Sequence, residues 1–194
     1  MKKMIPFWQQ YGPYLALAPA LTALLGSLYY SEIAGFIPCT LCWYQRILMY
    51  PLSLIILVGI IKQDKYLPNY VLPFSIMGIG VSSYHYLIEL GLLEQSATCS
   101  LGIPCNVRWV NYFGFITIPL LALTAFMMIT VIMAATKWAG SRKGGHFGLK
   151  QFGLLLGVIA LSVLLVSALA VFEQGGRPPV EQFVPTPMGP GLGD

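Results

Sequence analysis

Five long apolar blocks separated by short polar segments set the pattern of this chain. An α-helix needs about 20 residues, at about 1.5 Å per residue, to cross about 30 Å of hydrocarbon. The pattern therefore predicts an all-α integral membrane protein, an antiparallel bundle of four transmembrane helices with the last block as a fifth transmembrane helix. The predicted spans cover approximately residues 14–30, 42–61, 68–90, 113–136 and 152–172.

Composition supports this interpretation and divides the chain into three parts. Hydrophobic residues make up 57% of the chain and charged residues 9%, whereas soluble domains carry about 25% charge. Residues 1–136 hold the four predicted spans, residues 137–172 a basic segment and the extra helix, and residues 173–194 a tail rich in proline and glycine. Because the tail lacks apolar periodicity, we expect it to be disordered. No convincing cleavage site follows the first block, so we expect that helix to be retained.

The positive charge predicts how the helices are oriented and does not indicate a nucleic-acid partner. The formal net charge is +4, but no basic run is interleaved with aromatic residues. Cytoplasmic loops of membrane proteins carry an excess of Lys and Arg, so we expect the more basic set of segments to be cytoplasmic. That set holds Lys2, Lys3, Lys62, Lys65, Lys137, Arg142, Lys143 and Lys150. The opposite set holds Arg46, Arg108 and Arg177.

All four cysteines fall in segments predicted to lie outside the cytoplasm. They are Cys39, Cys42, Cys99 and Cys105, and disulfides persist on the outer side of a bacterial cytoplasmic membrane. Of the three possible pairings, spacing favours Cys39 with Cys42 and Cys99 with Cys105. A bond within the first pair would constrain little chain, and closely spaced dithiols are typical of redox centres. A structural staple is the alternative, above all for the second pair.

An arginine follows the first pair at helical spacing. If the second span begins near Cys39, the dithiol lies at a helix N-terminus, where backbone N–H groups and the helix dipole favour a thiolate. Arg46 lies four residues after Cys42, on the same helix face, where its charge would lower the pKa of Cys42 and hold an anionic or carbonyl ligand. Gln45 is placed to donate a hydrogen bond nearby. Alternatively, Arg46 only snorkels to the membrane interface.

Two ionisable residues, His85 and Glu89, share one face of the third span. A lone histidine is usually a satisfied core residue, but an ionisable side chain inside a membrane span indicates a functional site. Glu89 is placed to orient His85. A zinc site built from the four cysteines is a further alternative, which the neighbouring cationic Arg46 disfavours.

One motif, together with its setting, is similar to a known family. Residues 39–46, Cys-Thr-Leu-Cys-Trp-Tyr-Gln-Arg, open the second span, and a second cysteine pair lies in the loop before the fourth. This combination resembles the disulfide bond formation protein B family (DsbB), and looks most like its Bacillus BdbC-type members. The similarity covers roughly residues 8–136. The fifth apolar block and the tail lie outside the family's four-span pattern.

The resemblance implies an enzyme, a membrane oxidoreductase that transfers electrons from a protein dithiol to a quinone. Such an enzyme re-oxidises an extracytoplasmic thioredoxin-fold dithiol oxidase (DsbA-like), and its cofactor is menaquinone or ubiquinone. We expect a multi-pass protein of the bacterial cytoplasmic membrane with both cysteine pairs on the extracytoplasmic side. We also expect a monomer that contacts membrane lipid and binds no nucleic acid.

The resemblance also assigns roles to single residues. Cys99 would form a mixed disulfide with the partner, and its loop mate Cys105 would exchange with Cys39. Cys42 would be the thiolate that faces the quinone, and Arg46 would hold the quinone. The expected cofactor-binding residues are Cys42, Gln45, Arg46 and His85.

Two other functions are alternatives. A vitamin K epoxide reductase-like enzyme is also a four-helix quinone reductase, but its Cys-x-x-Cys pair follows the loop pair along the chain, and here the order is reversed. A non-catalytic membrane scaffold with two structural disulfides is the second alternative. Replacing Cys42 with serine separates the oxidase from the scaffold, because only a scaffold would misfold without that cysteine.

Overall fold

The described part of the chain is built from helices. The computed structural model describes residues 4–94, 99, 104–107, 110, 115–140 and 148–174. Its elements are α1 (Met4–Leu28), the π-helical turn η1 (Tyr29–Ile33), α2 (Thr40–Ile61), α3 (Leu67–Glu89), α4 (Ile118–Trp138) and α5 (Leu149–Gln174). Five of these helices are long and apolar enough to cross a membrane. The predicted all-α membrane fold is confirmed.

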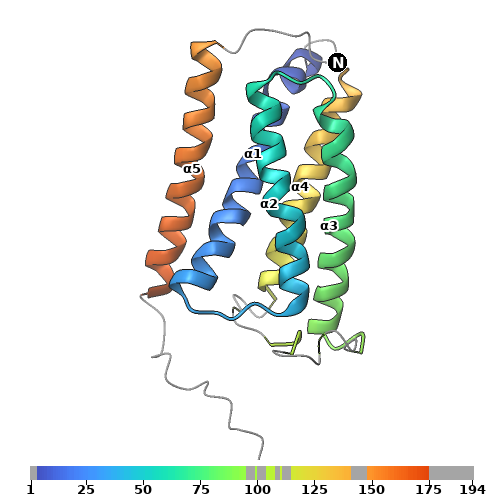
Figure 1. The fold of residues 1–194 in the computed structure, drawn as a ribbon, viewed down its shortest axis with the longest axis vertical. Helices are drawn as coiled ribbons and strands as arrows, with labels where there is room; N and C mark the ends of the chain where they lie inside the picture. The colour runs from blue at the N-terminus through green and yellow to red at the C-terminus, as the bar shows by residue number, and fades with distance from the viewer. Residues whose placement is uncertain are drawn as a thin grey trace, which may run out of the picture.

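Four helices form a bundle, and the fifth packs on its outside. In the bundle α1 packs against α2 and α4, and α3 packs against the same two helices. Helix α5 packs against α1 (Figure 1). Leu155 of α5 is buried in this contact, and Ser162 Oγ donates a hydrogen bond to the carbonyl oxygen of Ala18 at 3.4 Å. This arrangement matches the predicted four-helix bundle with one extra helix.

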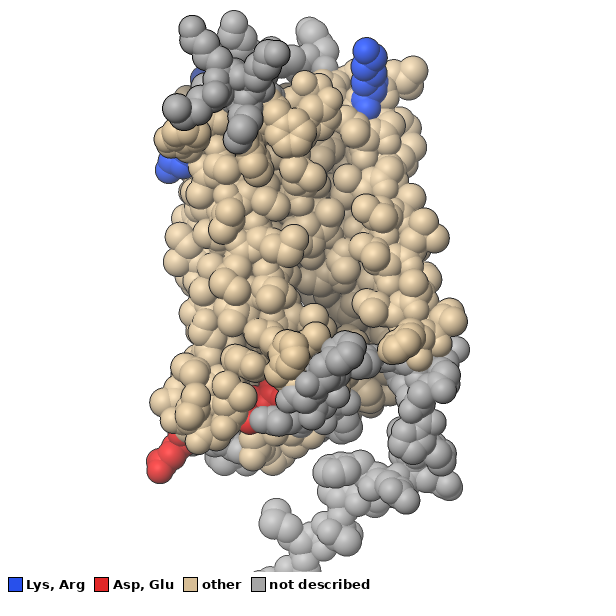
Figure 2. All heavy atoms as spheres, turned by 180° about the vertical axis from the view of Figure 1, so that it is seen from behind, with Lys and Arg blue, Asp and Glu red and all other residues tan. Residues whose placement is uncertain are grey.

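Most of the apolar surface of the helices faces outward. In the membrane-spanning window of α5 only 11% of the residues are buried inside the protein, against 39% for α2. Figure 2 shows a broad belt without charged side chains, with Lys and Arg at one end of that face and Asp and Glu at the other. Side chains that are apolar and exposed along about 30 Å are stable only against lipid tails. The chain is therefore a multi-pass membrane protein.

The helix bounds agree closely with the predicted spans for two helices and differ for the others. Helices α2 and α3 begin and end within two residues of the predicted spans, whereas α4 begins at Ile118, later than the predicted residue 113. Helix α1 starts earlier than its apolar block, and in this extension Gln9 Nε2 donates a 2.7 Å hydrogen bond to the carbonyl oxygen of Ala139, just after α4. Residues 173 and 174, placed in the predicted tail, belong to α5. The rest of the tail lies outside the described residues.

Close contacts between helices fix how the bundle packs. Ser53 of α2 is buried, and its hydroxyl reaches the carbonyl oxygen of Ala20 in α1 at 3.2 Å. On the opposite side of the bundle, the fully buried ring of Phe126 in α4 lies against Gly78 of α3, where a Cβ atom would collide with it. A glycine is therefore needed at this position for α3 and α4 to approach.

The two ends of the bundle differ in chemistry. The start of α2 and the end of α3 lie at the same end because the two helices run in opposite directions (Figure 1). Gly91, with φ 74°, ends α3 there, and its N–H donates to the carbonyl of Ile88. Cys39 and His85 therefore lie at this end. The described basic residues of the predicted cytoplasmic set lie next to helix ends at the opposite end: Lys62, Lys65, Lys137 and Lys150.

Candidate redox site

Cys39 caps the N-terminus of α2, as expected from the sequence. Its backbone is extended, with φ −70° and ψ 172°, and its Sγ accepts a hydrogen bond from the backbone N–H of Cys42 at 3.4 Å. The two sulfurs lie 3.1 Å apart, and both cysteines are free thiols. Unpaired amides at a helix start are donors that stabilise negative charge. The first pair is thus a dithiol at an anion-stabilising position.

The second pair, Cys99 and Cys105, is joined by a disulfide with a Cα–Cα distance of 5.5 Å. This bond is the pairing that spacing favoured. Both cysteines are buried, and they pack in one cluster with Cys39, while Cys42 contacts the same cluster. The loop disulfide and the helix dithiol therefore lie side by side, within a single buried cluster.

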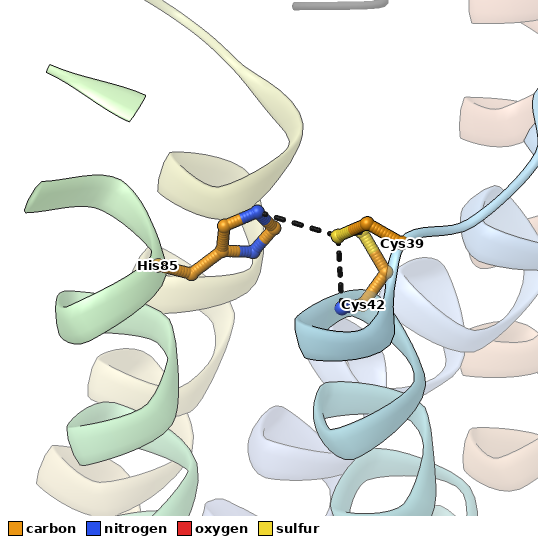
Figure 3. Close-up of side chains that lie close together, drawn as sticks. All are labelled: Cys39, Cys42 and His85. Carbon is orange, nitrogen blue, oxygen red and sulfur yellow. Dashed lines mark hydrogen bonds between the residues drawn. The ribbon is translucent and has the colours of Figure 1, made fainter. Parts of the chain in front are cut away.

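His85 reaches from α3 to the first cysteine pair (Figure 3) and also contacts the backbone of the second. Its Nε2 lies 3.6 Å from the Sγ of Cys39 and 3.1 Å from the carbonyl oxygen of Cys105. Its Nδ1 lies 3.2 Å from Nε2 of Gln45, one turn into α2. His85 and Gln45 are both buried. The sequence predicted these residues at one site, but it did not predict that His85 would contact the loop.

The partner that orients His85 differs from the one expected. Glu89 shares the face of α3, as its spacing predicted, and it lines the same small cavity as His85. However, Gln45 on α2 occupies Nδ1 of the histidine ring, and Cys39 and Cys105 share Nε2. Spacing along one helix predicted the neighbour on α3, whereas the real partner depends on how α2 and α3 pack.

The environment of Cys39 favours its thiolate. A hydrogen bond from the Cys42 thiol, with a smaller contribution from His85, holds the pKa of Cys39 well below its usual value, although burial opposes this. Cys39 precedes α2 and so stands at the membrane boundary. The sequence favoured a thiolate at Cys42, because Arg46 lies one turn away. In the structure, the contacts that stabilise a thiolate are made to Cys39 instead. Its sulfur accepts a hydrogen bond from the backbone N–H of Cys42 and lies next to the Cys42 thiol and the His85 ring.

Arg46 points away from the pocket and towards α1. Its Nη2 donates a 3.0 Å hydrogen bond to the carbonyl oxygen of Ser27, and its guanidinium lies 5.5 Å from the ring centroid of Trp43. Trp43 and Tyr44 are exposed on the outside of α2, and Cys42 is half-buried beside them. The expected quinone-binding residues therefore divide into two groups, with Arg46 on the outer side of α2 and Gln45 with His85 on its inner side.

A small cavity of about 20 Å³ opens beside the dithiol. Cys39, Cys42, His85 and Glu89 line it, together with the start of α4 and residues 104, 107 and 110. This is room for about one water molecule, so the ring of a quinone does not fit inside it.

Three potential metal ligands also meet here. The ligand atoms of Cys39, Cys42 and His85 lie within 4.8 Å of one another. The zinc site considered from the sequence used all four cysteines. In the structure two of them are joined in a disulfide, so the four sulfurs do not form that site.

Comparisons with known proteins identify the family. The family profile described as "Disulfide bond formation protein DsbB" matches residues 10–139, which contain most of α1, the whole of α2 to α4 and all four cysteines. The chain belongs to the DsbB family. It is therefore a membrane oxidoreductase of the disulfide-forming class, and the resemblance inferred from residues 39–46 is confirmed.

Curated relatives agree with this assignment. "Probable disulfide formation protein C" of Halalkalibacterium halodurans is 52% identical over 113 residues, which cover 58% of this chain and 82% of the relative. "Disulfide bond formation protein C" of Bacillus subtilis is 49% identical over 125 residues, which cover 64% of this chain and 91% of the relative. The DsbB match ends before α5 begins. No solved structure matches the chain significantly.

Proposed function

We propose that this DsbB-family protein re-oxidises an extracytoplasmic thioredoxin-fold dithiol oxidase and passes the electrons to a quinone. The route runs from the Cys99/Cys105 pair to the Cys39/Cys42 pair. The single observation that carries this proposal is the buried cluster that holds both cysteines of the loop disulfide together with Cys39. Two separate structural staples would not need to share one cluster.

The first step takes electrons from the partner. A thiolate of the reduced partner attacks the Cys99 sulfur, and the Cys99–Cys105 bond breaks to release Cys105 as a thiolate. The second thiol of the partner then attacks the mixed disulfide, which frees Cys99 and leaves the partner oxidised. Each event is thiol–disulfide exchange, which requires a poised thiolate and access and needs no general base.

The second step moves the electrons to the helix pair. The Cys105 thiolate attacks Cys39 in the Cys39–Cys42 disulfide and releases Cys42 as a thiolate. Cys99 then attacks Cys105 in the mixed disulfide, re-forms the loop bond and releases Cys39. The redox states in the structure, a loop disulfide beside a helix dithiol, correspond to the state after this exchange.

The residues around Cys42 suit a quinone head group, whose two carbonyl oxygens accept hydrogen bonds. Arg46 carries several N–H donors on the outer side of α2, and Cys42 is half-buried next to it. We assign the head group to this outer face, within reach of Arg46 and Cys42, with Gln45 and His85 behind the dithiol. A bound quinone accepts two electrons and two protons, which allows the Cys39–Cys42 disulfide to re-form.

We assign the cysteine end of the bundle to the outside of a bacterial cytoplasmic membrane. The described lysines of the basic set lie at the opposite end, and Lys-rich loops stay in the cytoplasm. The loop disulfide supports the same orientation, because disulfides persist outside the reducing cytoplasm.

A serine series tests the proposal. In Cys105→Ser, Cys99 keeps its thiol but no loop disulfide can form, so a reduced partner should stay reduced. In Cys42→Ser, partner oxidation should fall to background while membrane insertion and the Cys99–Cys105 bond persist. Non-reducing gels after thiol alkylation measure both results. Misfolding of Cys42→Ser, or unchanged partner oxidation, would show that the cysteines are not a redox relay.

A further inference from the structure

His85 lies between the two cysteine pairs, at a position from which one ring nitrogen contacts both. Its Nε2 is 3.6 Å from the Cys39 sulfur and 3.1 Å from the Cys105 carbonyl oxygen. Figure 3 shows the ring reaching across from α3 to the start of α2. The ring is buried, with 3% of its surface exposed, so water does not compete strongly for these contacts.

The partners of the ring determine which nitrogen carries the proton. An amide nitrogen can only donate, so the Nε2 of Gln45 makes Nδ1 of His85 the acceptor. A carbonyl oxygen can only accept, so the Cys105 oxygen requires a proton on Nε2 of His85. The hydrogen-bond partners on the two sides of the ring thus indicate the same tautomer. His85 carries its proton on Nε2, the nitrogen that faces Cys39.

We propose that His85, oriented by Gln45, is a catalytic residue for the exchange between the two cysteine pairs, in which its Nε2–H stabilises the Cys39 sulfur as it leaves. This inference rests on the proposed function, since it concerns the internal step of that route. It gives His85 a role towards the cysteines, distinct from the quinone-site role that the sequence suggested. Gln45 is a positioning residue, because it acts through the histidine.

The step is balanced within the protein. In the mixed disulfide between Cys39 and Cys105, the Cys99 thiolate attacks the Cys105 sulfur. The Cys99–Cys105 bond forms, the Cys39–Cys105 bond breaks, and its electron pair leaves on Cys39. A better-stabilised thiolate leaves faster, so a donor at Cys39 drives the exchange towards a reduced helix pair. The hydrogen bond to the Cys105 carbonyl oxygen holds the loop next to the ring that faces Cys39.

The charged and titratable groups around Cys39 make a donor there necessary. Cys42 and, one turn further, Arg46 lie on α2, although Arg46 is directed towards α1. On α3, Glu89 lines the same cavity as the sulfur, and a carboxylate there would repel a thiolate. The described start of α4, residues 117–119, lines the cavity without a charged side chain. From α3, His85 is thus the group whose contact favours the thiolate.

A three-cysteine background tests this step without quinone or partner. Cys42→Ser retains an O–H donor next to Cys39 and leaves three sulfurs to share one disulfide. The full-length protein is purified in detergent, equilibrated, quenched and alkylated, and mass spectrometry then shows whether Cys39 or Cys99 is the free thiol. We expect Cys39 to be free, because its thiolate is stabilised and the loop disulfide is retained.

Removing the donor should shift this equilibrium. In the same background, His85→Phe fills the ring position without an N–H, and the ratio of free Cys39 to free Cys99 should fall about tenfold or more. Gln45→Leu should shift the ratio in the same direction, because it releases the ring. His85→Gln retains an amide donor and should restore part of the ratio. Ser82→Ala, another buried polar change on α3, should leave the ratio unchanged.

The pH dependence separates a catalytic donor from a merely structural residue. The difference between the parent and His85→Phe should disappear as pH falls through the pKa of Cys39, because a protonated sulfur gains nothing from the donor. A difference that is independent of pH would contradict the proposal. Equal ratios in the parent and His85→Phe, or equal ratios in His85→Phe and His85→Gln, would also overturn it. None of these results depends on quinone, so they leave the proposed function to its own test.

Discussion

At the scale of single residues, the two thiols of the helix pair have different environments. Cys39 accepts from the amide that opens α2 and lies next to a histidine, whereas Cys42 lies inside the first turn. The pKa of Cys39 is lowered chiefly by the hydrogen bond from Cys42. A lowered pKa in the folded state means that stabilisation by the thiolate is fully present above the unfolded pKa. It is lost as pH falls through the folded pKa.

This asymmetry predicts how the dithiol is alkylated. In the reduced protein, Cys39 should react with iodoacetamide at pH values well below the ordinary pKa of a thiol, because its thiolate persists there. The rate should fall only when the pH approaches the lowered pKa of Cys39. Mass spectrometry of samples quenched at each pH measures the two sites separately. The same protein unfolded in detergent is the control, and identical profiles in the two states would contradict the prediction.

Arg46 is predicted to act on the quinone and not on the thiol exchange. Its guanidinium already bonds the Ser27 carbonyl, and its planar fork leaves further donors for a second acceptor. Arg46→Ala should raise the KM for quinone by about tenfold to a hundredfold, the range for a lost hydrogen bond to a charged group. Arg46→Lys should raise the KM for quinone by less than Arg46→Ala does. Loss of the mixed disulfide with the partner in Arg46→Ala would instead indicate a role in exchange.

The sequence predicted the members of the site better than their contacts. Cys39 and His85 were found because a close dithiol and an ionisable side chain in a membrane span both indicate function. The bond between His85 and Gln45 depends on how two helices pack, and its bond to Cys105 uses a backbone carbonyl. Neither of these two contacts leaves a spacing pattern in the sequence of a single helix. For that reason spacing indicated Glu89 as the orienting residue, and the structure has Gln45.

At the scale of helices, hydrophobic length predicted the elements, and polar contacts decided where they end. The spans of α2 and α3 follow the apolar blocks because lipid-facing residues must be apolar throughout. Helix α1 extends beyond its block through Gln9, which bonds the backbone just after α4. A contact between the ends of two helices is not visible in hydropathy. Boundaries that depend on such contacts could therefore not be predicted.

A matched pair of glycines on α3 tests the packing of the bundle. Gly78→Ala would push a methyl group into the buried ring of Phe126, whereas Gly80→Ala meets no atom within 4 Å. Overpacking costs about 1–3 kcal/mol, while alanine otherwise favours a helix by about 1 kcal/mol. Gly78→Ala should therefore lower the thermal midpoint in detergent, and Gly80→Ala should leave it equal or higher. Equal midpoints for both variants would mean that α3 and α4 are not tightly packed at Gly78.

At the scale of the whole molecule, the bundle separates its chemistry between two ends. The dithiol, the loop disulfide and His85 gather at one end, and the described lysines of the basic set gather at the other. On the face drawn in Figure 2, a belt without charged side chains lies between the two ends. Helix α5 packs along α1, and it lies beyond the region matched by the family. Cys39, His85 and the loop disulfide all lie within the matched region.

The most direct test of the proposed route measures both of its ends at once. The purified protein in detergent, without oxygen, is mixed with a reduced thioredoxin-fold donor and with ubiquinone or menaquinone. We predict that quinol and donor disulfide form in equal amounts, because each carries two electrons, and that Cys39→Ser abolishes both. Donor disulfide without quinol, or no reduction of either quinone, would contradict the proposed transfer of electrons from dithiol to quinone.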